Sequence, residues 1–151
     1  MTTAARALRD LIANHAPVIA PGAFDGLSAR LVEQAGFPAV YATGGGIARS
    51  LGIPDLGLMG LDEIVKRLEG MVEVTTIPLI ADADTGHGNA LNAQKTARAF
   101  ERAGVAGFHL EDQVFPKKCG HYDDKSIVPS KEMTQKIKAV KDALIDPDML
   151  L

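Results

Sequence analysis

Two aspartates separated by one residue, Asp82 and Asp84, follow the apolar run 78–81 and precede a glycine-containing segment. Residues two apart in a strand point to the same face, so both carboxylates can reach one point beyond the end of this run. Mg²⁺ is a hard cation that prefers such oxygen ligands. By spacing alone, the two residues are equally well explained as loop acids that cap the following helix.

Other acidic residues follow a neighbouring apolar run or lie in a long connection. Glu111 follows the run 107–110, and several carboxylates that converge without a cation would repel one another. This favours a metal site over helix capping. Asp55 lies in a long connection, which in compact domains is often functional, but a surface turn explains it equally well. His109 stands inside an apolar run and is more simply a core or supporting histidine than a catalytic one.

A basic segment surrounds the only cysteine, in the order Lys117, Lys118, Cys119, Gly120 and His121. Lysines beside a thiol favour the thiolate or bind an anionic substrate, and a nearby imidazole can stabilise charge. Cys119 is therefore a candidate acid, base or nucleophile. From the residues alone, an exposed basic loop with an incidental cysteine is the slightly better explanation.

Three consecutive glycines follow Thr43 at the end of the apolar run 39–42. Glycines such as Gly44 and Gly45 expose backbone N–H groups and let a carboxylate or phosphate approach closely. The segment lacks the spacing of a Walker loop or a dinucleotide-binding fingerprint. Taken alone, it is better explained as a plain tight turn.

Four short apolar runs, at 18–20, 39–42, 78–81 and 107–110, must position these residues. Helical periodicity fills the segments between and after them, at 27–35, 64–72, 93–104 and 133–144, and an N-terminal helix precedes them. Alternating strands and helices predict a parallel sheet covered by helices. The polar residues follow the carboxyl ends of the strands, where ligands bind in both (β/α)₈ barrels and open doubly wound sheets, so the pattern does not choose between these folds.

The composition of the 151 residues is that of a globular protein, with 46% hydrophobic residues and a net charge of −3. This balance gives no reason to expect nucleic acid or an anionic membrane as a partner. No apolar run is long enough for a transmembrane helix. The single cysteine cannot form an intrachain disulfide, so we expect a reducing compartment, the cytoplasm.

The motifs also occur in a specific order: PGAFD (21–25), TGGG (43–46), PDLG (54–57), DADTGHGN (82–89), EDQ (111–113) and KKCGH (117–121). This series resembles the isocitrate lyase/phosphoenolpyruvate mutase superfamily from about residue 21 to residue 151. The last motif looks like the lyase branch of that superfamily, and the whole series is most similar to the 2-methylisocitrate lyases. The resemblance implies a Mg²⁺-dependent carbon–carbon lyase acting on a di- or tricarboxylate or 2-oxoacid, with cleavage of 2-methylisocitrate to pyruvate and succinate in propionate breakdown.

The resemblance also implies a role for each matching residue. Asp82 and Asp84 would hold Mg²⁺, with Asp55 and Glu111 supporting the metal site. Closure of the loop 114–128 would exclude water. The remaining implied roles are substrate binding for Thr43, Gly44 and Gly45, proton donation by Cys119, positioning of substrate and loop by Lys117 and Gly120, and adjustment of the thiol by His121. Thr43 stands where a serine is expected in a 2-methylisocitrate lyase.

The implied fold is the N-terminal half of a (β/α)₈ TIM-type barrel, because a whole barrel needs about 250 residues. We expect residues 1–151 to form one partial barrel domain, truncated after the fourth βα unit, with a fifth strand starting at 149–151. The chain alone should then have little or no lyase activity, and it should form homo-oligomers, as full-length relatives are generally tetramers. The alternatives are an oxaloacetate hydrolase, dimethylmalate lyase or carboxyphosphonoenolpyruvate mutase-like enzyme, or a non-catalytic half-barrel.

Overall fold

The computed structural model describes residues 3–14 and 17–151 and contains a four-stranded parallel sheet. The strands lie side by side in chain order: β1 (Gly22–Ala23), β2 (Val40–Ala42), β3 (Leu79–Asp82) and β4 (Gly107–His109). The helices are α1 (Ala4–Ala13), α2 (Gly26–Gln34), α3 (Gly44–Ser50), α4 (Leu61–Val74), α5 (Ala90–Ala103) and α6 (Ser130–Ala143). The predicted alternation of parallel strands and helices is confirmed.

Helices α2 and α5 begin where a side chain satisfies free backbone N–H groups. Asp25 caps α2, since its carboxylate accepts from the Ser28 N–H, and Asn89 caps α5 in the same way. Helix α5 ends at Gly104, whose φ of 86° is a left-handed conformation that glycine adopts without strain. These caps set the lengths of the connections that leave the sheet.

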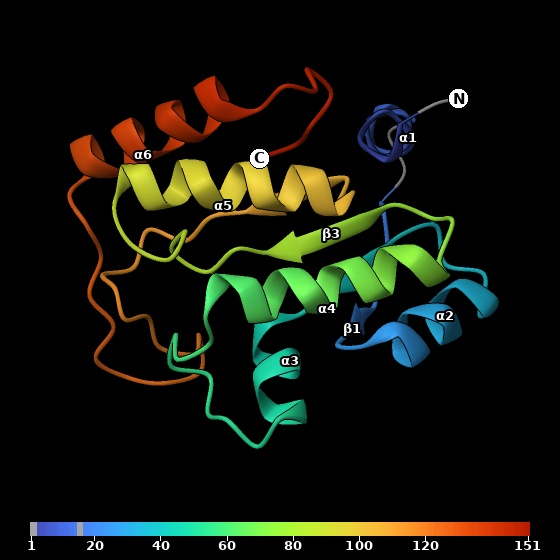
Figure 1. Ribbon diagram of the computed structural model, residues 1–151, viewed down its shortest axis with the longest axis horizontal. Coiled ribbons are helices and arrows are strands. Elements are labelled where there is room, and N and C mark those ends of the chain that lie inside the picture. Colours follow the sequence, from blue (N-terminus) through green and yellow to red (C-terminus); the bar gives the residue numbers. More distant parts are fainter. Residues whose placement is uncertain (1–2, 15–16) are drawn as a thin grey trace.

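The core lies between the sheet and the helices that follow each strand. Figure 1 shows α4 and α5 running along β3, with α6 packed outside α5 and α2 beside α4. Phe100 of α5 is fully buried and meets Phe108 of β4 edge to face, with ring centroids 5.6 Å apart. Such a pair fixes the helix against the strand and thereby positions the residues at the carboxyl end of β4.

On the far side of β4, residues 149–151 lie beside the sheet and continue its parallel pairing. Leu150 forms a parallel bridge with Gly107, and its carbonyl accepts from the Phe108 N–H at 3.0 Å. Met149 is almost fully buried. This single bridge lies where a fifth strand of a barrel would start, and a full fifth strand there stays a prediction.

The structure corrects two details of the sequence analysis. The first strand is not at 18–20: β1 consists of Gly22 and Ala23, which pair with Tyr41 and Ala42, and Ile19 is 61% exposed. Apolar character alone misplaced the strand, because neighbouring strands decide which backbone groups pair. The glycines after Thr43 do not form a plain turn but the first turn of α3.

Among the described residues, no helix combines the length and the apolar character needed to cross a bilayer.

Candidate active site at the carboxyl ends of the strands

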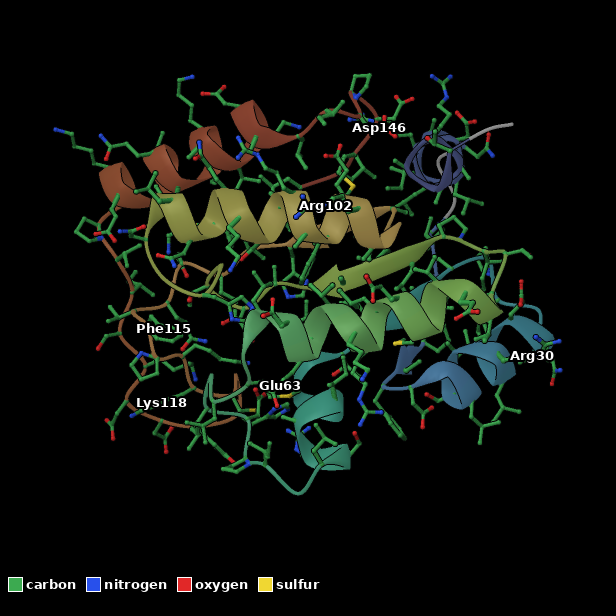
Figure 2. The ribbon with its side chains drawn as sticks, in the orientation of Figure 1. Arg30, Glu63, Arg102, Phe115, Lys118 and Asp146 are labelled. Carbon is green, nitrogen blue, oxygen red and sulfur yellow. The ribbon has the colours of Figure 1, made fainter. Side chains whose placement is uncertain are left out.

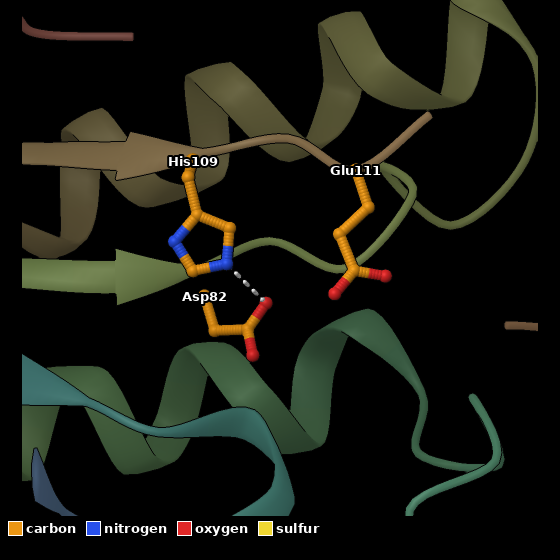
Figure 3. A group of neighbouring side chains, drawn as sticks. All are labelled: Asp82, His109 and Glu111. Carbon is orange, nitrogen blue, oxygen red and sulfur yellow. Dashed lines mark ion pairs between the residues drawn. The ribbon is translucent and has the colours of Figure 1, made fainter. Parts of the chain in front are cut away.

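The carboxyl ends of β3 and β4 bring together the acidic residues that follow them. The parallel register pairs Asp82 of β3 with His109 of β4, and His109 Nε2 lies 3.0 Å from Asp82 Oδ1. Glu111 follows two residues later (Figure 3), and these three side chains each offer a ligand atom within 4.8 Å of the others. They form a group that could hold a metal ion, which we call the Asp–His–Glu group.

The charges within the Asp–His–Glu group influence one another. Burial opposes ionisation of Asp82, but hydrogen bonds from His109 and from the Asp84 N–H keep the pKa of Asp82 below its ordinary value. The hydrogen bond to Asp82 raises the pKa of His109. Burial raises the pKa of Glu111. When it is protonated, His109 balances part of the negative charge of these carboxylates.

An aromatic side chain supports the histidine from β2. The ring of Tyr41 stacks on His109 with centroids 5.6 Å apart and planes 14° apart, and its hydroxyl lies 3.3 Å from Nε2. Burial and the nearby carboxylates of Asp82 and Glu111 raise the pKa of Tyr41, which keeps the phenol protonated. Tyr41 therefore holds the imidazole in place as a neutral neighbour.

A second charged group lies beside the first. Lys117 Nζ is 2.6 Å from Asp55 Oδ1 and 2.7 Å from Asp84 Oδ1, and the lysine is only 3% exposed. Burial disfavours a charged lysine, but the bonds to Asp55 and Asp84 outweigh it and hold the pKa of Lys117 above its ordinary value. Burial and the repulsion of Asp82 raise the pKa of Asp84. We call these three residues the Lys117 triad.

The two groups share a backbone contact, since the Asp84 N–H donates to Asp82 Oδ1 at 2.9 Å. Asp84 lies beyond the end of β3 and has a φ of 47°, so the strand alternation invoked for the aspartate pair does not hold at this residue. A turn brings the carboxylates together instead. Their assignment as joint ligands of Mg²⁺ stays a prediction.

The glycines at the start of α3 leave room for the carboxylates of Asp82 and Asp55. A Cβ at Gly44 would lie 2.8 Å from Asp82 Oδ2, and one at Gly45 would lie 2.7 Å from Asp55 Oδ2. Neither distance leaves room for a side chain, so glycine at both positions lets the acids pack against the helix. The hydroxyl of Thr43 caps α3 by accepting from the Gly46 N–H at 3.2 Å.

The loop after β4 folds back over these groups and buries the cysteine. The Cys119 N–H donates to the Asp55 carbonyl at 3.0 Å, and the thiol is 6% exposed. Sγ lies 3.6 Å from His121 Nδ1 and 3.7 Å from Arg49 Nη2. Cys119 and His121 of the predicted closing loop thus contact each other, and the backbone of Cys119 is bound to that of Asp55.

The side chain of Gln113 ties this loop to the sheet. Its amide nitrogen donates to Glu111 Oε2 at 2.8 Å and to the Lys118 carbonyl at 2.9 Å. Figure 2 shows Phe115 and Lys118 farther out on the loop, beyond the carboxyl end of the sheet. Lys118 Nζ donates to the Asp124 carbonyl, away from the thiol. Gly120 is exposed, and nothing in the structure explains its lack of a side chain.

Sequence reasoning missed two residues of the site, Tyr41 and Arg49. Of the two explanations left open for His109, a core or a supporting histidine, the structure favours the second, because the side chain is 46% exposed and contacts Asp82. Tyr41 and Arg49 gave no motif signal at all. The place of His109 two residues before Glu111 at a strand end was the one sequence clue to its role.

Comparison with known proteins identifies the family. Residues 8–151 match the family described as phosphoenolpyruvate phosphomutase. The chain is 49% identical over 152 aligned residues to 2,3-dimethylmalate lyase of Eubacterium barkeri, covering 100% of this chain and 52% of that enzyme. It is 50% identical over 123 aligned residues to 2-methylisocitrate lyase of Bacillus subtilis, covering 82% and 41% respectively.

The fold agrees with a solved structure of phosphonopyruvate hydrolase in complex with oxalate and Mg²⁺. The two superpose with a TM-score of 0.88 at 32% identity, over 97% of this chain and 50% of the other. The chain thus spans about half the length of the relatives it matches, as the N-terminal half of a barrel would. On these matches and on its parallel βα architecture, the chain belongs to the phosphoenolpyruvate mutase/isocitrate lyase superfamily.

Proposed function

We propose that this chain supplies the metal-binding side of the active site in a Mg²⁺-dependent carbon–carbon lyase that cleaves a small 2-hydroxy di- or tricarboxylate. The observation that carries the proposal is the burial of Cys119 in a loop that is bound to the carboxylate-bearing segments: the Cys119 N–H donates to the Asp55 carbonyl, and Lys117 of the same loop contacts the carboxylates of Asp55 and Asp84. Carbon–carbon cleavage needs both a centre that stabilises negative charge and a proton donor. Lyases among the relatives support this reaction class.

The donor set fits Mg²⁺. Asp82 and Glu111 offer carboxylate oxygens, which this cation prefers, and Asp84 Oδ1 is buried with Lys117 as its partner and no other hydrogen bond. We propose that Asp82, Asp84 and Glu111 hold the ion, directly or through water, with His109 and Asp55 in support. When bound, Mg²⁺ acts as a Lewis acid toward the oxygens of the 2-oxoacid product. The related phosphonopyruvate hydrolase was solved with Mg²⁺ and oxalate, a 2-oxoacid analogue.

The groups of the protein then bind and orient the substrate and protonate the departing fragment. The start of α3 at Gly44 and Gly45 receives the carboxylate of the substrate, with Thr43 at its edge. The substrate hydroxyl gives its proton to solvent as it binds and becomes an alkoxide. The carbon–carbon bond next to it then breaks as the 2-oxo group forms, and the electron pair of that bond passes to the carbon beside a carboxylate. Cys119 donates its proton to that carbon and becomes a thiolate, which His121 stabilises. The docked loop excludes water meanwhile.

We propose 2-methylisocitrate, cleaved to pyruvate and succinate, or 2,3-dimethylmalate as the substrate, because lyases for these compounds are 50% and 49% identical to this chain over the aligned residues. The relatives are about twice as long. We therefore propose that the catalytic form includes further barrel strands, that this chain alone turns over little substrate, and that it self-associates. A reducing cytoplasmic setting suits its free thiol.

Mg²⁺-dependent oxalate binding tests the site without requiring turnover. Calorimetry should show oxalate binding to the 151-residue chain with Mg²⁺ and none without it. Asp82→Asn should abolish this binding, whereas Asp142→Asn, which changes an exposed carboxylate on α6 in the same way, should not. Equal oxalate binding with and without Mg²⁺ would contradict the proposed site.

Formation of pyruvate from 2-methylisocitrate and 2,3-dimethylmalate tests the reaction itself. We expect turnover near background from the isolated chain. Robust Mg²⁺-dependent turnover that disappears in Cys119→Ser would support the chemistry but refute the need for further strands.

A further inference from the structure

Arg49 reaches from α3 to the cysteine. It lies four residues after Gly45, on the same side of the helix, and helical side chains tilt toward the N-terminus. The guanidinium accordingly lies over Gly45, where a Cβ would come within 3.0 Å of Nη1. Its other nitrogen, Nη2, is 3.7 Å from Cys119 Sγ. The missing side chain at Gly45 thus leaves the space through which Arg49 approaches the thiol.

The other cations near the thiol are already neutralised or turned away. Lys117 is held between Asp55 and Asp84, and Lys118 donates to a backbone carbonyl of the loop. Within residues 3–14 and 17–151, no carboxylate lies within 4.0 Å of the Arg49 guanidinium. Arg49 therefore carries a positive charge that is not paired with a carboxylate of the described residues and that can bind an anion beside the thiol.

We propose that Arg49 is a specificity-determining residue that binds the carboxylate attached to the carbon protonated by Cys119, an inference that rests on the proposed lyase function. In that step the electron pair of the broken carbon–carbon bond moves onto the carbon and into its carboxylate. The proton then passes from Sγ to the carbon. A carboxylate one bond from the reacting carbon lies within reach of a donor 3.7 Å from the sulfur.

The guanidinium suits this task, because its planar fork matches a carboxylate with two parallel hydrogen bonds. Its contact with the thiol is made with the loop bound to Asp55 through the Cys119 N–H. Arg49 thereby links recognition of the carboxylate to the loop position that delivers the proton. Substrates that carry a carboxylate on the departing fragment are favoured over those that lack one there.

Alkylation of Cys119 tests the proposal directly. Iodoacetate carries a carboxylate one bond from the carbon that sulfur attacks, whereas iodoacetamide has the same shape without the charge. In both reactions sulfur bonds to carbon, iodide leaves and the thiol proton goes to solvent. Both rates depend on the same fraction of Cys119 in the thiolate form, so this fraction drops out of their ratio. Because the chain has a single cysteine, the reaction site is unambiguous. Dividing by the same ratio for glutathione removes intrinsic reactivity.

We expect the normalised ratio of iodoacetate to iodoacetamide rates to exceed one in the wild-type chain. Arg49→Gln should lower it about tenfold, the effect of one lost charge-assisted hydrogen bond. Arg49→Lys should retain part of the preference, because it keeps the charge without the fork. The matched control Lys118→Gln removes a charge next in sequence to the thiol and should change the ratio less than about twofold, as expected for an exposed, screened charge.

Three results would overturn the proposal: an unchanged ratio in Arg49→Gln, an equal fall in Lys118→Gln, or no reaction of the folded chain with either reagent. Circular dichroism of each variant confirms that the ratio is measured on folded protein, and Arg49→Lys supplies a second test if Arg49→Gln does not fold. The assay needs neither Mg²⁺ nor turnover. A failed lyase assay would therefore leave this result standing, and a failed alkylation test would leave the metal site standing.

Discussion

Replacing Lys117 by methionine would remove the only cation of the Lys117 triad while keeping the length of the side chain. In the folded protein its ammonium group lies 2.6 Å from Asp55 and 2.7 Å from Asp84. Asp55 is 8% exposed, so water reaches it poorly. Lys117→Met therefore leaves two neighbouring carboxylates without their counter-charge.

The expected cost follows from the burial of the triad. Removing one partner of a buried ion pair typically costs about 3–5 kcal/mol, because the other charge stays buried and unpaired. The side chain of Asp84 is still 14% exposed, and its pKa is already raised, so protonation relieves part of the penalty. We expect a loss of about 3 kcal/mol in the free energy of unfolding, at the low end of that range.

Urea denaturation followed by circular dichroism measures this loss. With a denaturant slope of about 2 kcal/mol per M, the midpoint should fall by about 1.5 M. Mg²⁺ should restore more stability to Lys117→Met than to the wild type, because the freed carboxylates attract the cation. At about 100 times the dissociation constant, binding of the ion to the folded state adds about 2.7 kcal/mol.

Lys118→Met is the matched control, since the ammonium group of this neighbouring lysine donates to a backbone carbonyl and contacts no carboxylate of the described residues. It should change stability by less than about 0.5 kcal/mol. Two results would refute the conclusion that the Lys117 ammonium group balances the charge of Asp55 and Asp84. One is a loss of unfolding free energy below about 1 kcal/mol in Lys117→Met, and the other is equal stabilisation of Lys117→Met and the wild type by Mg²⁺.

Three further substitutions test other parts of the structure. Phe100→Ala should cost about 3–5 kcal/mol of unfolding free energy in urea, because this ring is fully buried. Asp25→Ala should cost about 1 kcal/mol at pH 7 and progressively less as the pH falls below 3.8. The hydrogen bonds of the cap lower the pKa of Asp25, so its contribution is complete above the unfolded value of 3.8 and is lost as the pH falls through the lower folded value. A loss that does not change with pH would contradict this. Gly44→Ala should push Asp82 aside and weaken Mg²⁺-dependent oxalate binding at least tenfold. Gly70→Ala is the control, because a Cβ at this position meets no atom within 4 Å. It should leave oxalate binding unchanged and stabilise its helix by up to about 1 kcal/mol.

The sequence by itself determined the class of fold and the end of the sheet that carries the chemistry. Apolar runs alternating with helical periodicity imply parallel strands, and parallel strands place all their carboxyl ends at one edge. For this reason Asp82 and Glu111 could be predicted to meet. The ordered motifs also resembled one superfamily, and the comparisons confirm that the chain belongs to it.

Only the tertiary structure decided which groups contact which. The resemblance implied that Lys117 helps to position the substrate. In the structure its ammonium group lies between the carboxylates of Asp55 and Asp84, which belong to other loops. His109 meets Asp82 through the register of β3 and β4, and Arg49 reaches Cys119 across a glycine of its own helix. Distances between residues 27 to 70 positions apart depend on strand register, loop path and packing, none of which leaves a local pattern of apolar and polar residues.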